Sequence, residues 1–217
     1  MSNHLPNRPA PSVYLITDRR RLKSSDDKDH VQALIDFIDN ALAAGIDMVQ
    51  IREPDLPARD VFNVACRAAD SAARWGAKVL VNDRADVAAA AGTGVHLTTR
   101  SIDVAVIRGC FGRNILIGAS THSLREARAA EADGANFVVF GPVFETESKR
   151  IYGPPVGIES LRETASRLRV PVLALGGVTA SNFRLPLEAG AAGIAGISLF
   201  TDTADLSSLV RAIKNQG

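Results

Sequence analysis

The stretch MVQIREPDLPARDVFNVACRAADSAARWGAKVLVND, residues 48–83, contains two short apolar runs separated by a segment whose apolar residues recur at helical spacing. Within each run the apolar residues stand largely side by side, which is typical of a strand covered on both faces. Strands of that kind are usually parallel, because helices cover both faces of a parallel sheet. The stretch therefore predicts one strand–helix–strand crossover unit.

The same pattern occurs eight times along the chain. The expected strands lie within residues 12–18, 48–53, 78–83, 94–99, 116–122, 137–144, 170–177 and 193–200. The expected helices are residues 30–44, 58–75, 84–91, 102–110, 123–133, 158–168, 180–189 and 204–215. Eight such units favour an α/β fold of the (β/α)8 TIM-barrel type, as a single domain over residues 12–217. Residues 1–11 are polar and proline-rich, and we expect them to be a disordered N-terminal lead-in.

An open, doubly wound sheet is the alternative fold. Such a sheet normally has fewer strands and carries a glycine-rich turn after the first one. Here the first expected strand is followed by Asp18-Arg19-Arg20-Arg21, without a glycine, and the charged residues 19–29 suggest a solvated loop. The strand count and this turn favour the barrel.

The composition points to a protein without a global charge that would attract nucleic acid or a membrane surface. The chain has 217 residues, of which 46% are apolar and 23% charged, and its net charge is +1. The N-terminal residues lack the apolar core of a signal peptide, and no apolar run is long enough to span a membrane. Cys66 and Cys110 suggest buried thiols in a reducing compartment. We therefore expect a cytoplasmic protein that binds neither nucleic acid nor membrane.

In a barrel of this type the chemistry lies at the carboxyl ends of the strands, and the loops after strands seven and eight often bind a phosphate group. Here those loops contain Gly176-Gly177 and Gly196-Ile197-Ser198. Glycines let backbone N–H groups approach an anion closely, so we expect a phosphate site. The alternative is that the glycines only permit tight packing.

The ends of the second and third strands carry further candidates. Gln50 and Arg52 are two residues apart, so their side chains share a face and together suit an oxyanion. The alternative for Arg52 is an internal salt bridge. Asp83, after Asn82, is a reasonable oxygen ligand for Mg²⁺, and its alternative role is to cap the helix of residues 84–91.

The fifth and sixth strands lead into polar loops. His122 follows Ser120 at the fifth strand and is a candidate acid–base group, whereas His96 at the fourth is more often structural. The long segment 141–150 contains Thr146 and Lys149, whose hydroxyl and ammonium groups could close over a phosphate.

Taken in order, the motifs YLITD, VQIRE, VNDRADVA, GVHL, IGASTHS, FGPVFETESK, LALGGVT and GISLF resemble the thiamine phosphate synthase family, which also contains the related thiazole tautomerases. The resemblance runs from about residue 13 to residue 200. It implies a (β/α)8 barrel that joins hydroxymethylpyrimidine pyrophosphate to a thiazole phosphate, with Mg²⁺ neutralising the departing pyrophosphate. The implied partners are these two phosphorylated small molecules and, because barrels of this kind often pair, a second copy in a homodimer.

The resemblance also implies roles for single residues. Arg52 and Lys149 match catalytic cations on the pyrophosphate, and His122 matches the acid–base catalyst of the tautomerase branch. Asp83 matches a metal ligand. The residues that match the substrate-binding set are Gln50, Arg52, Asn82, Ser120, Thr146, Lys149, Gly177, Ile197 and Ser198.

Two positions depart from the synthase pattern. Pro54 stands where the family usually has a lysine, and Ser101 stands where it has a second metal-binding carboxylate, for which Asp103 and Asp55 are candidate replacements. These losses leave two alternatives to the synthase. One is a tautomerase of thiazole carboxylate phosphate that uses His122, and the other is a non-catalytic protein that binds thiazole phosphate.

Overall fold

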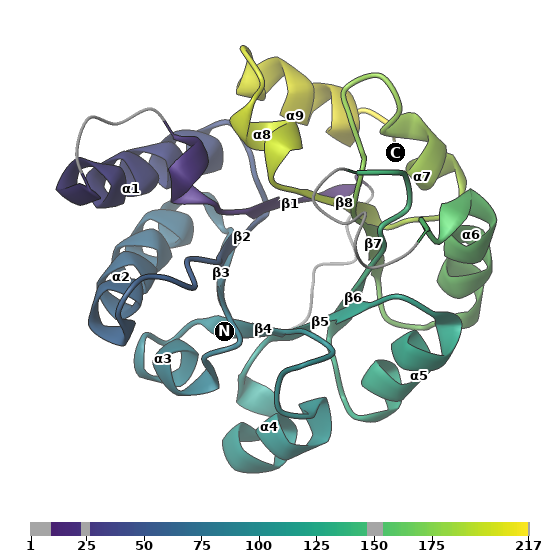
Figure 1. Ribbon diagram of the computed structural model, residues 1–217, viewed down its shortest axis with the longest axis horizontal. Coiled ribbons are helices and arrows are strands. Elements are labelled where there is room, and N and C mark those ends of the chain that lie inside the picture. Colours follow the sequence, from purple (N-terminus) through teal and green to yellow (C-terminus); the bar gives the residue numbers. More distant parts are fainter. Residues whose placement is uncertain (1–9, 23–26, 147–153, 217) are drawn as a thin grey trace.

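The structure is a computed structural model, which describes residues 10–22, 27–146 and 154–216. All eight strands pair in parallel and in chain order, and β1 closes the ring by pairing with β8. Helices surround this ring, as Figure 1 shows. The prediction of a (β/α)8 barrel is confirmed, and the open-sheet alternative is excluded by the β1–β8 pairing. Residues 1–9 of the expected lead-in lie outside the described residues.

The strands are β1 Ser12–Ile16, β2 Met48–Ile51, β3 Lys78–Asn82, β4 Gly94–Leu97, β5 Ile117–Thr121, β6 Phe137–Phe140, β7 Val172–Ala174 and β8 Gly193–Gly196. The α-helices are α1 Asp27–Ala43, α2 Ala58–Trp75, α3 Ala85–Ala90, α4 Val104–Phe111, α5 Leu124–Ala132, α6 Gly157–Arg167, α7 Arg184–Glu188, α8 Ser198–Thr201 and α9 Leu206–Lys214. The described residues also form the 3₁₀ turns η1 Arg19–Arg21 and η2 Gly112–Asn114. No described helix is long and apolar enough to cross a membrane.

Alternation along the strands produces two apolar layers, because successive side chains point to opposite faces. The outer layer packs strand residues against the helices; α2, for example, buries Val61, Val64 and Ala68 and ends at Gly76, whose φ of 65° lets its N–H donate to Ala72. The inner layer fills the barrel with Tyr14, Ile16, Met48, Leu80, Leu116, Phe137, Val139, Leu173 and Ala195. The barrel is therefore a packed core with one polar end rather than a pore.

One glycine makes room for a polar residue inside this core. Gly118 on β5 lies opposite His96 on β4. A Cβ at residue 118 would lie 2.7 Å from His96 Nδ1 and 2.4 Å from Phe137 Cζ. The absence of a side chain there is what lets the imidazole ring stand inside the barrel.

Three sequence expectations need correction. The run 193–200 is not one strand: β8 ends at Gly196, and Ser198 begins the short helix α8. The segment 19–29 is not simply a solvated loop, because it contains η1 and the start of α1, and the Arg19 side chain is only 11% exposed. Cys110 is exposed rather than buried, and Cys66 is half-buried.

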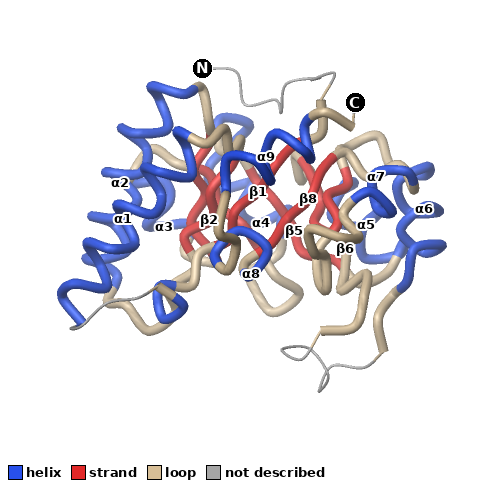
Figure 2. The backbone as a smooth tube through the Cα atoms, turned by 90° about the horizontal axis from the view of Figure 1, so that it is seen from above, coloured by secondary structure: helices blue, strands red, loops and turns tan. Residues whose placement is uncertain are grey.

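The two ends of the barrel differ. In Figure 2, η1 and α8 lie at the lower end, together with the loop that leaves β6, and the C-terminus lies at the upper end. The lower end is formed by the segments that follow the strands. The candidate residues that the structure describes belong to these segments or to the last residues of the strands that lead into them.

Candidate active site at the carboxyl ends of the strands

The polar end of the barrel begins with an amide pair. Gln50 on β2 is 2% exposed, and its Nε2 donates to Asn82 Oδ1 on β3 at 2.8 Å. Gln50 Oε1 is buried and accepts no hydrogen bond from any described residue. A buried acceptor without a donor is uncommon, and a ligand with an N–H or O–H group would satisfy it. The contact places Gln50 and Asn82, two members of the expected substrate-binding set, next to each other on neighbouring strands.

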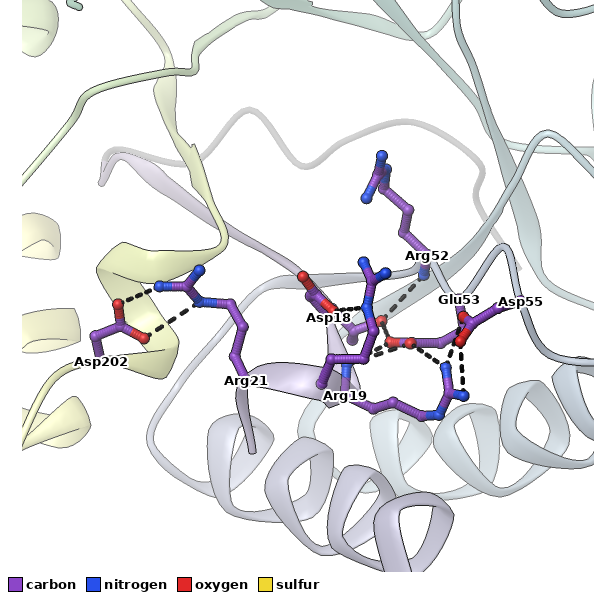
Figure 3. A network of polar contacts seen from close by, with 9 residues as sticks. Asp18, Arg19, Arg21, Arg52, Glu53, Asp55 and Asp202 are labelled. Atoms are coloured by element: carbon purple, nitrogen blue, oxygen red, sulfur yellow. Dashed lines mark hydrogen bonds and ion pairs between the residues drawn. The ribbon is translucent and has the colours of Figure 1, made fainter. Parts of the chain in front are cut away.

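Arg52 follows Gln50 and behaves differently from the arginines of η1. Its backbone N–H donates to Thr17 Oγ1 at 3.0 Å, while its guanidinium forms no ion pair with any described residue. Figure 3 shows this guanidinium directed away from Glu53 and Asp55. The alternative reading of Arg52 as half of an internal salt bridge is therefore wrong for the described residues, and the guanidinium is free to meet an anion.

Glu53 anchors the rim next to Arg52 (Figure 3). Its carboxylate, buried with a side-chain exposure of 1%, accepts from Thr17 Oγ1 at 2.6 Å and from the Arg19 backbone N–H and guanidinium. The same guanidinium donates to both oxygens of Asp55, at 2.7 and 2.8 Å. These hydrogen bonds hold the pKa of Asp55 below its usual value. Asp55 is thus an ion-pair partner of Arg19, which argues against it as the missing metal ligand.

Asp83 stands at the end of β3 in an unusual backbone conformation. Its φ is 65°, the one described non-glycine residue with positive φ, and its N–H donates to His96 O at 2.8 Å. The cap position of α3 belongs to Arg84, without a side-chain cap hydrogen bond, so the expectation that Asp83 caps this helix is wrong. Positive φ outside glycine often marks a functional residue. Asp83 is exposed and directly follows β3, at the carboxyl end of the strand.

Ser101, at the position of the family's second metal-binding carboxylate, is used in a turn, and Asp103 stays a candidate replacement. Ser101 Oγ accepts from the Thr98 N–H at 2.8 Å and so closes the turn after β4. Asp103 is exposed at the start of α4 and makes no capping hydrogen bond. Within the described ranges no three histidine, cysteine or acidic side chains converge as a metal site. The donor set fits an Mg²⁺ ion held by one or two carboxylates, Asp83 among them, together with substrate phosphate oxygens, which is a common arrangement for this ion.

The two histidines near the mouth differ in surroundings. His96 is 1% exposed inside the barrel, and burial lowers its pKa to about 3, so the ring is neutral. His122 is exposed after β5; its Nδ1 hydrogen bonds with the Gly141 carbonyl and its backbone N–H donates to Glu126 Oε2 at 2.7 Å. Because a carbonyl can only accept, Nδ1 carries the proton and the neutral ring offers Nε2 as a base.

The loops after β6 and β7 form a joint surface. Val143 and Phe144 donate from their backbone N–H groups to Leu175 and Gly176 at 2.8 and 3.0 Å. Gly177 has φ 64°, and a Cβ there would lie 2.6 Å from Glu145 O, so tight packing requires a glycine at this position. The Gly177 N–H donates to no described residue, so the same glycine can also bind a phosphate through its backbone.

Thr146 is the last described residue of its loop, and Lys149 lies outside the described residues. Across from this loop, half-buried Ile197 precedes α8, whose first residue is the exposed Ser198. These two residues follow β8, whose neighbour β7 leads into Gly177, so the structure brings the expected phosphate-binding segments to adjacent strands.

Sequence reasoning missed three residues that support the site: Tyr14, Thr17 and Arg19. Alternation within SVYLI could have assigned Tyr14 and Ile16 to one face and Val13 and Leu15 to the other. No local signal pairs Thr17 or Arg19 with Glu53, because the partners are 36 and 34 residues apart.

This is a (β/α)8 barrel of parallel strands whose carboxyl ends gather amides, a hydroxyl, a carboxylate and a guanidinium that has no ion-pair partner among the described residues. Residues 13–200 match the family described as thiamine monophosphate synthase, and the chain belongs to this family.

Named relatives agree with that assignment. The chain is 44% identical over 203 residues to a putative thiamine-phosphate synthase of Geobacter sulfurreducens, covering 93% of this chain and 92% of the relative. It is 38% identical over 177 residues to the thiamine-phosphate synthase of Methanoculleus marisnigri, covering 81% and 84%. The solved thiamine phosphate pyrophosphorylase of Pyrococcus furiosus superposes with a TM-score of 0.81 at 31% identity, covering 94% of this chain and 96% of the other.

Proposed function

We propose that this protein is a thiamine phosphate synthase, which joins hydroxymethylpyrimidine pyrophosphate to thiazole phosphate and releases pyrophosphate. The family match over residues 13–200 and the relatives named for this activity support the proposal. The observation that carries it at the site is the guanidinium of Arg52. Arg19, Arg20 and Arg21 are each paired with a carboxylate, whereas Arg52 is not paired with any described residue. A cation left unpaired at the mouth is suited to an anionic substrate.

The reaction breaks the bond between the pyrimidine methylene carbon and a pyrophosphate oxygen. The thiazole nitrogen then forms a bond to the same carbon. Negative charge develops on the departing pyrophosphate, so the transition state is stabilised by donors fixed in place beforehand. In this chain Arg52 and Ser120 supply such donors, and Lys149 is proposed as a third. Gln50 and Asn82 orient the substrate, and backbone N–H groups around Gly177 and Ser198 hold the thiazole phosphate.

Mg²⁺ is proposed as the cofactor, and Asp83 would hold it together with pyrophosphate oxygens. When bound, the ion would neutralise charge on the leaving group. Because Ser101 and Pro54 replace a carboxylate and a cation of the family pattern, the site retains a similar net charge with fewer fixed groups. We therefore expect activity that needs more Mg²⁺ than a site with two carboxylates requires.

The direct test is to incubate the purified protein with both substrates and Mg²⁺ and to measure thiamine phosphate. Arg52→Gln should lower kcat/KM by about 100- to 1000-fold, the loss typical of removing one preorganised donor. Arg52→Lys, which keeps the charge but not the planar fork, should recover part of it. No product at any Mg²⁺ concentration would refute the proposal.

The tautomerase remains the second candidate function, because the contact between His122 and the Gly141 carbonyl leaves Nε2 available as a base. This activity would need no metal and would be lost in His122→Gln. Metal-free isomerisation of thiazole carboxylate phosphate, together with absence of the synthase product, would decide for it. The third candidate function is a non-catalytic protein that binds thiazole phosphate, and calorimetry with thiazole phosphate tests it. Binding without synthase or tautomerase activity would identify such a protein.

A homodimer and a cytoplasmic location accompany this proposal. Support for a dimer comes from Ile102 and Val106, apolar side chains four residues apart at the start of α4, which are 61% and 51% exposed. Light scattering of the purified protein would measure the mass directly. A single-copy mass at micromolar concentration would refute the dimer.

A further inference from the structure

A chain of three polar side chains crosses the barrel interior below the mouth. Tyr14 Oη lies 3.2 Å from His96 Nδ1, and His96 Nε2 lies 2.9 Å from Ser120 Oγ. Tyr14 is 0% exposed and His96 is 1% exposed, whereas Ser120 is half-buried and stands at the edge of the mouth. The chain therefore connects β1, β4 and β5, and only its Ser120 end is open to a ligand.

Packing leaves the rings little freedom to rearrange. The Tyr14 and Phe137 rings meet edge to face, with centroids 5.6 Å apart and an interplanar angle of 80°. His96 fits into the space that Gly118 leaves, where a Cβ would lie 2.7 Å from Nδ1. The two hydrogen bonds are thus held by contacts from both sides, and their directions can be assigned from the donors and acceptors present.

Only one arrangement satisfies every buried group. Tyr14 has no described acceptor for its O–H other than His96 Nδ1. If Tyr14 donates to Nδ1, the neutral ring carries its proton on Nε2 and donates to Ser120 Oγ. The opposite tautomer would leave the phenol proton buried without an acceptor, which is unfavourable. A doubly protonated ring would also leave the phenol proton without an acceptor, and burial disfavours the charge of such a ring.

We propose that Tyr14, acting through the Nε2–H tautomer of His96, fixes Ser120 as a hydrogen-bond donor toward the mouth. Ser120 Oγ accepts from the ring, so its own O–H proton is free to point at a ligand. An O–H donor suits an anionic oxygen, whereas a serine that gave its proton to histidine would offer only lone pairs. Tyr14 is thus a positioning residue, and the ligand concerned is the pyrophosphate group. This inference rests on the proposed function.

The tautomer can be measured without any turnover. Nitrogen-15 correlation spectra distinguish protonated from unprotonated ring nitrogens, and the His96 signal is identified by its absence in His96→Asn. We expect Nδ1 unprotonated and Nε2 protonated. In Tyr14→Phe the preference of His96 for the Nε2–H tautomer should be lost, because without the phenol either tautomer leaves one ring nitrogen without a partner. An Nδ1–H tautomer in the unaltered protein would overturn the proposal, whether or not the protein is a synthase.

Binding and kinetics supply the second test. Ser120→Ala should weaken inorganic pyrophosphate binding and lower kcat/KM for the pyrimidine substrate by about 10- to 100-fold, as for a lost hydrogen bond to a charged group. Tyr14→Phe should cost about fivefold on its own and nothing further when Ser120 is already alanine, since coupled residues are not additive. Additive losses would show that Tyr14 acts only on the fold and would overturn the proposal.

A matched control removes a buried hydroxyl elsewhere. Thr164 on α6 is 0% exposed, and its Oγ1 has no described partner. Thr164→Val should leave both pyrophosphate binding and the His96 tautomer unchanged. If the protein binds pyrophosphate with the predicted pattern but forms no product, the proposed function fails while the positioning role of Tyr14 stands.

Discussion

The two sides of the barrel mouth are built differently. On the β1–β2 side four carboxylates of the described residues have cationic partners: Glu53 and Asp55 share Arg19, Asp18 pairs with Arg20, and Asp202, which follows α8, pairs with Arg21. On the β3–β4 side the Asp83 carboxylate has no ion-pair partner among the described residues, and Ser101 only closes a turn.

This difference distinguishes carboxylates that are paired within the protein from a carboxylate that is available to a ligand. A paired, buried carboxylate such as Glu53 holds two loops together, and its charge is already compensated. An exposed carboxylate on a left-handed backbone, such as Asp83, contributes little to folding and keeps its oxygens available for an ion. Substitutions on the two sides should therefore change different observables, and the following experiments are ordered from the largest expected effect to the smallest.

The largest effect is expected for Asp83→Asn. Loss of the carboxylate should lower synthase activity by about 1000-fold, because stabilisation by a metal ion is worth several kcal/mol. The melting temperature should not change, since asparagine tolerates positive φ well. Initial rates over a range of Mg²⁺ concentrations, together with thermal melts, measure both. Unchanged activity in the variant would show that Asp83 is not a metal ligand.

Glu53→Gln should show the reverse pattern. The amide keeps the shape but weakens the bonds from Thr17 and Arg19, so we expect a loss of about 2–3 kcal/mol in the free energy of unfolding. For a chain of this size that corresponds to a drop in melting temperature of about 5–10 °C. Glu163→Gln, which alters a pair whose side chains are both 56% exposed, is the control and should change little. A melting temperature equal to that of the unaltered protein would contradict the anchoring role.

Ser101→Asp tests whether a second carboxylate on the β3–β4 side strengthens Mg²⁺ binding. A second carboxylate near Asp83 should lower the Mg²⁺ concentration for half-maximal activity by about tenfold, because affinity follows the number of charged ligands. Thr99→Asp, at an exposed neighbour in the same loop, adds equal charge as a control. If both variants shift the Mg²⁺ dependence equally, the effect is general electrostatics and Ser101 does not face the ion.

The smallest effect concerns Asp55 and pH. Hydrogen bonds from Arg19 hold the pKa of Asp55 below the value of about 3.9 expected for an unfolded chain. A depressed folded pKa contributes stability above that value, and the contribution is lost as the pH falls through the folded pKa. Asp55→Asn should thus lower stability by less than about 1 kcal/mol at pH 7, since the pair is partly exposed. Thermal melts at pH 7 and pH 2.5 should show the difference shrinking in acid; a larger difference in acid would contradict the assignment.

Much of the architecture could be predicted because the signals are local. Residues 58–75 have an apolar stripe at helical spacing, and α2 has the same bounds in the structure. The eight strands recur in the predicted order for the same reason. The end of β8 could not be placed, since Ile197 to Phe200 continue an apolar run while the backbone turns into α8.

Sequence alone determined the barrel and the set of polar residues at the carboxyl ends of the strands, because hydrophobic periodicity and strand order are properties of neighbouring residues. Only the tertiary structure decided how those residues are used. It paired Arg19 with Glu53, gave Arg52 no ion-pair partner among the described residues, gave Asp83 a positive φ, and placed Tyr14 against His96 across 82 residues of chain. Hydrogen bonds and ion pairs depend on distance in space, and closing the barrel is what brings those partners together.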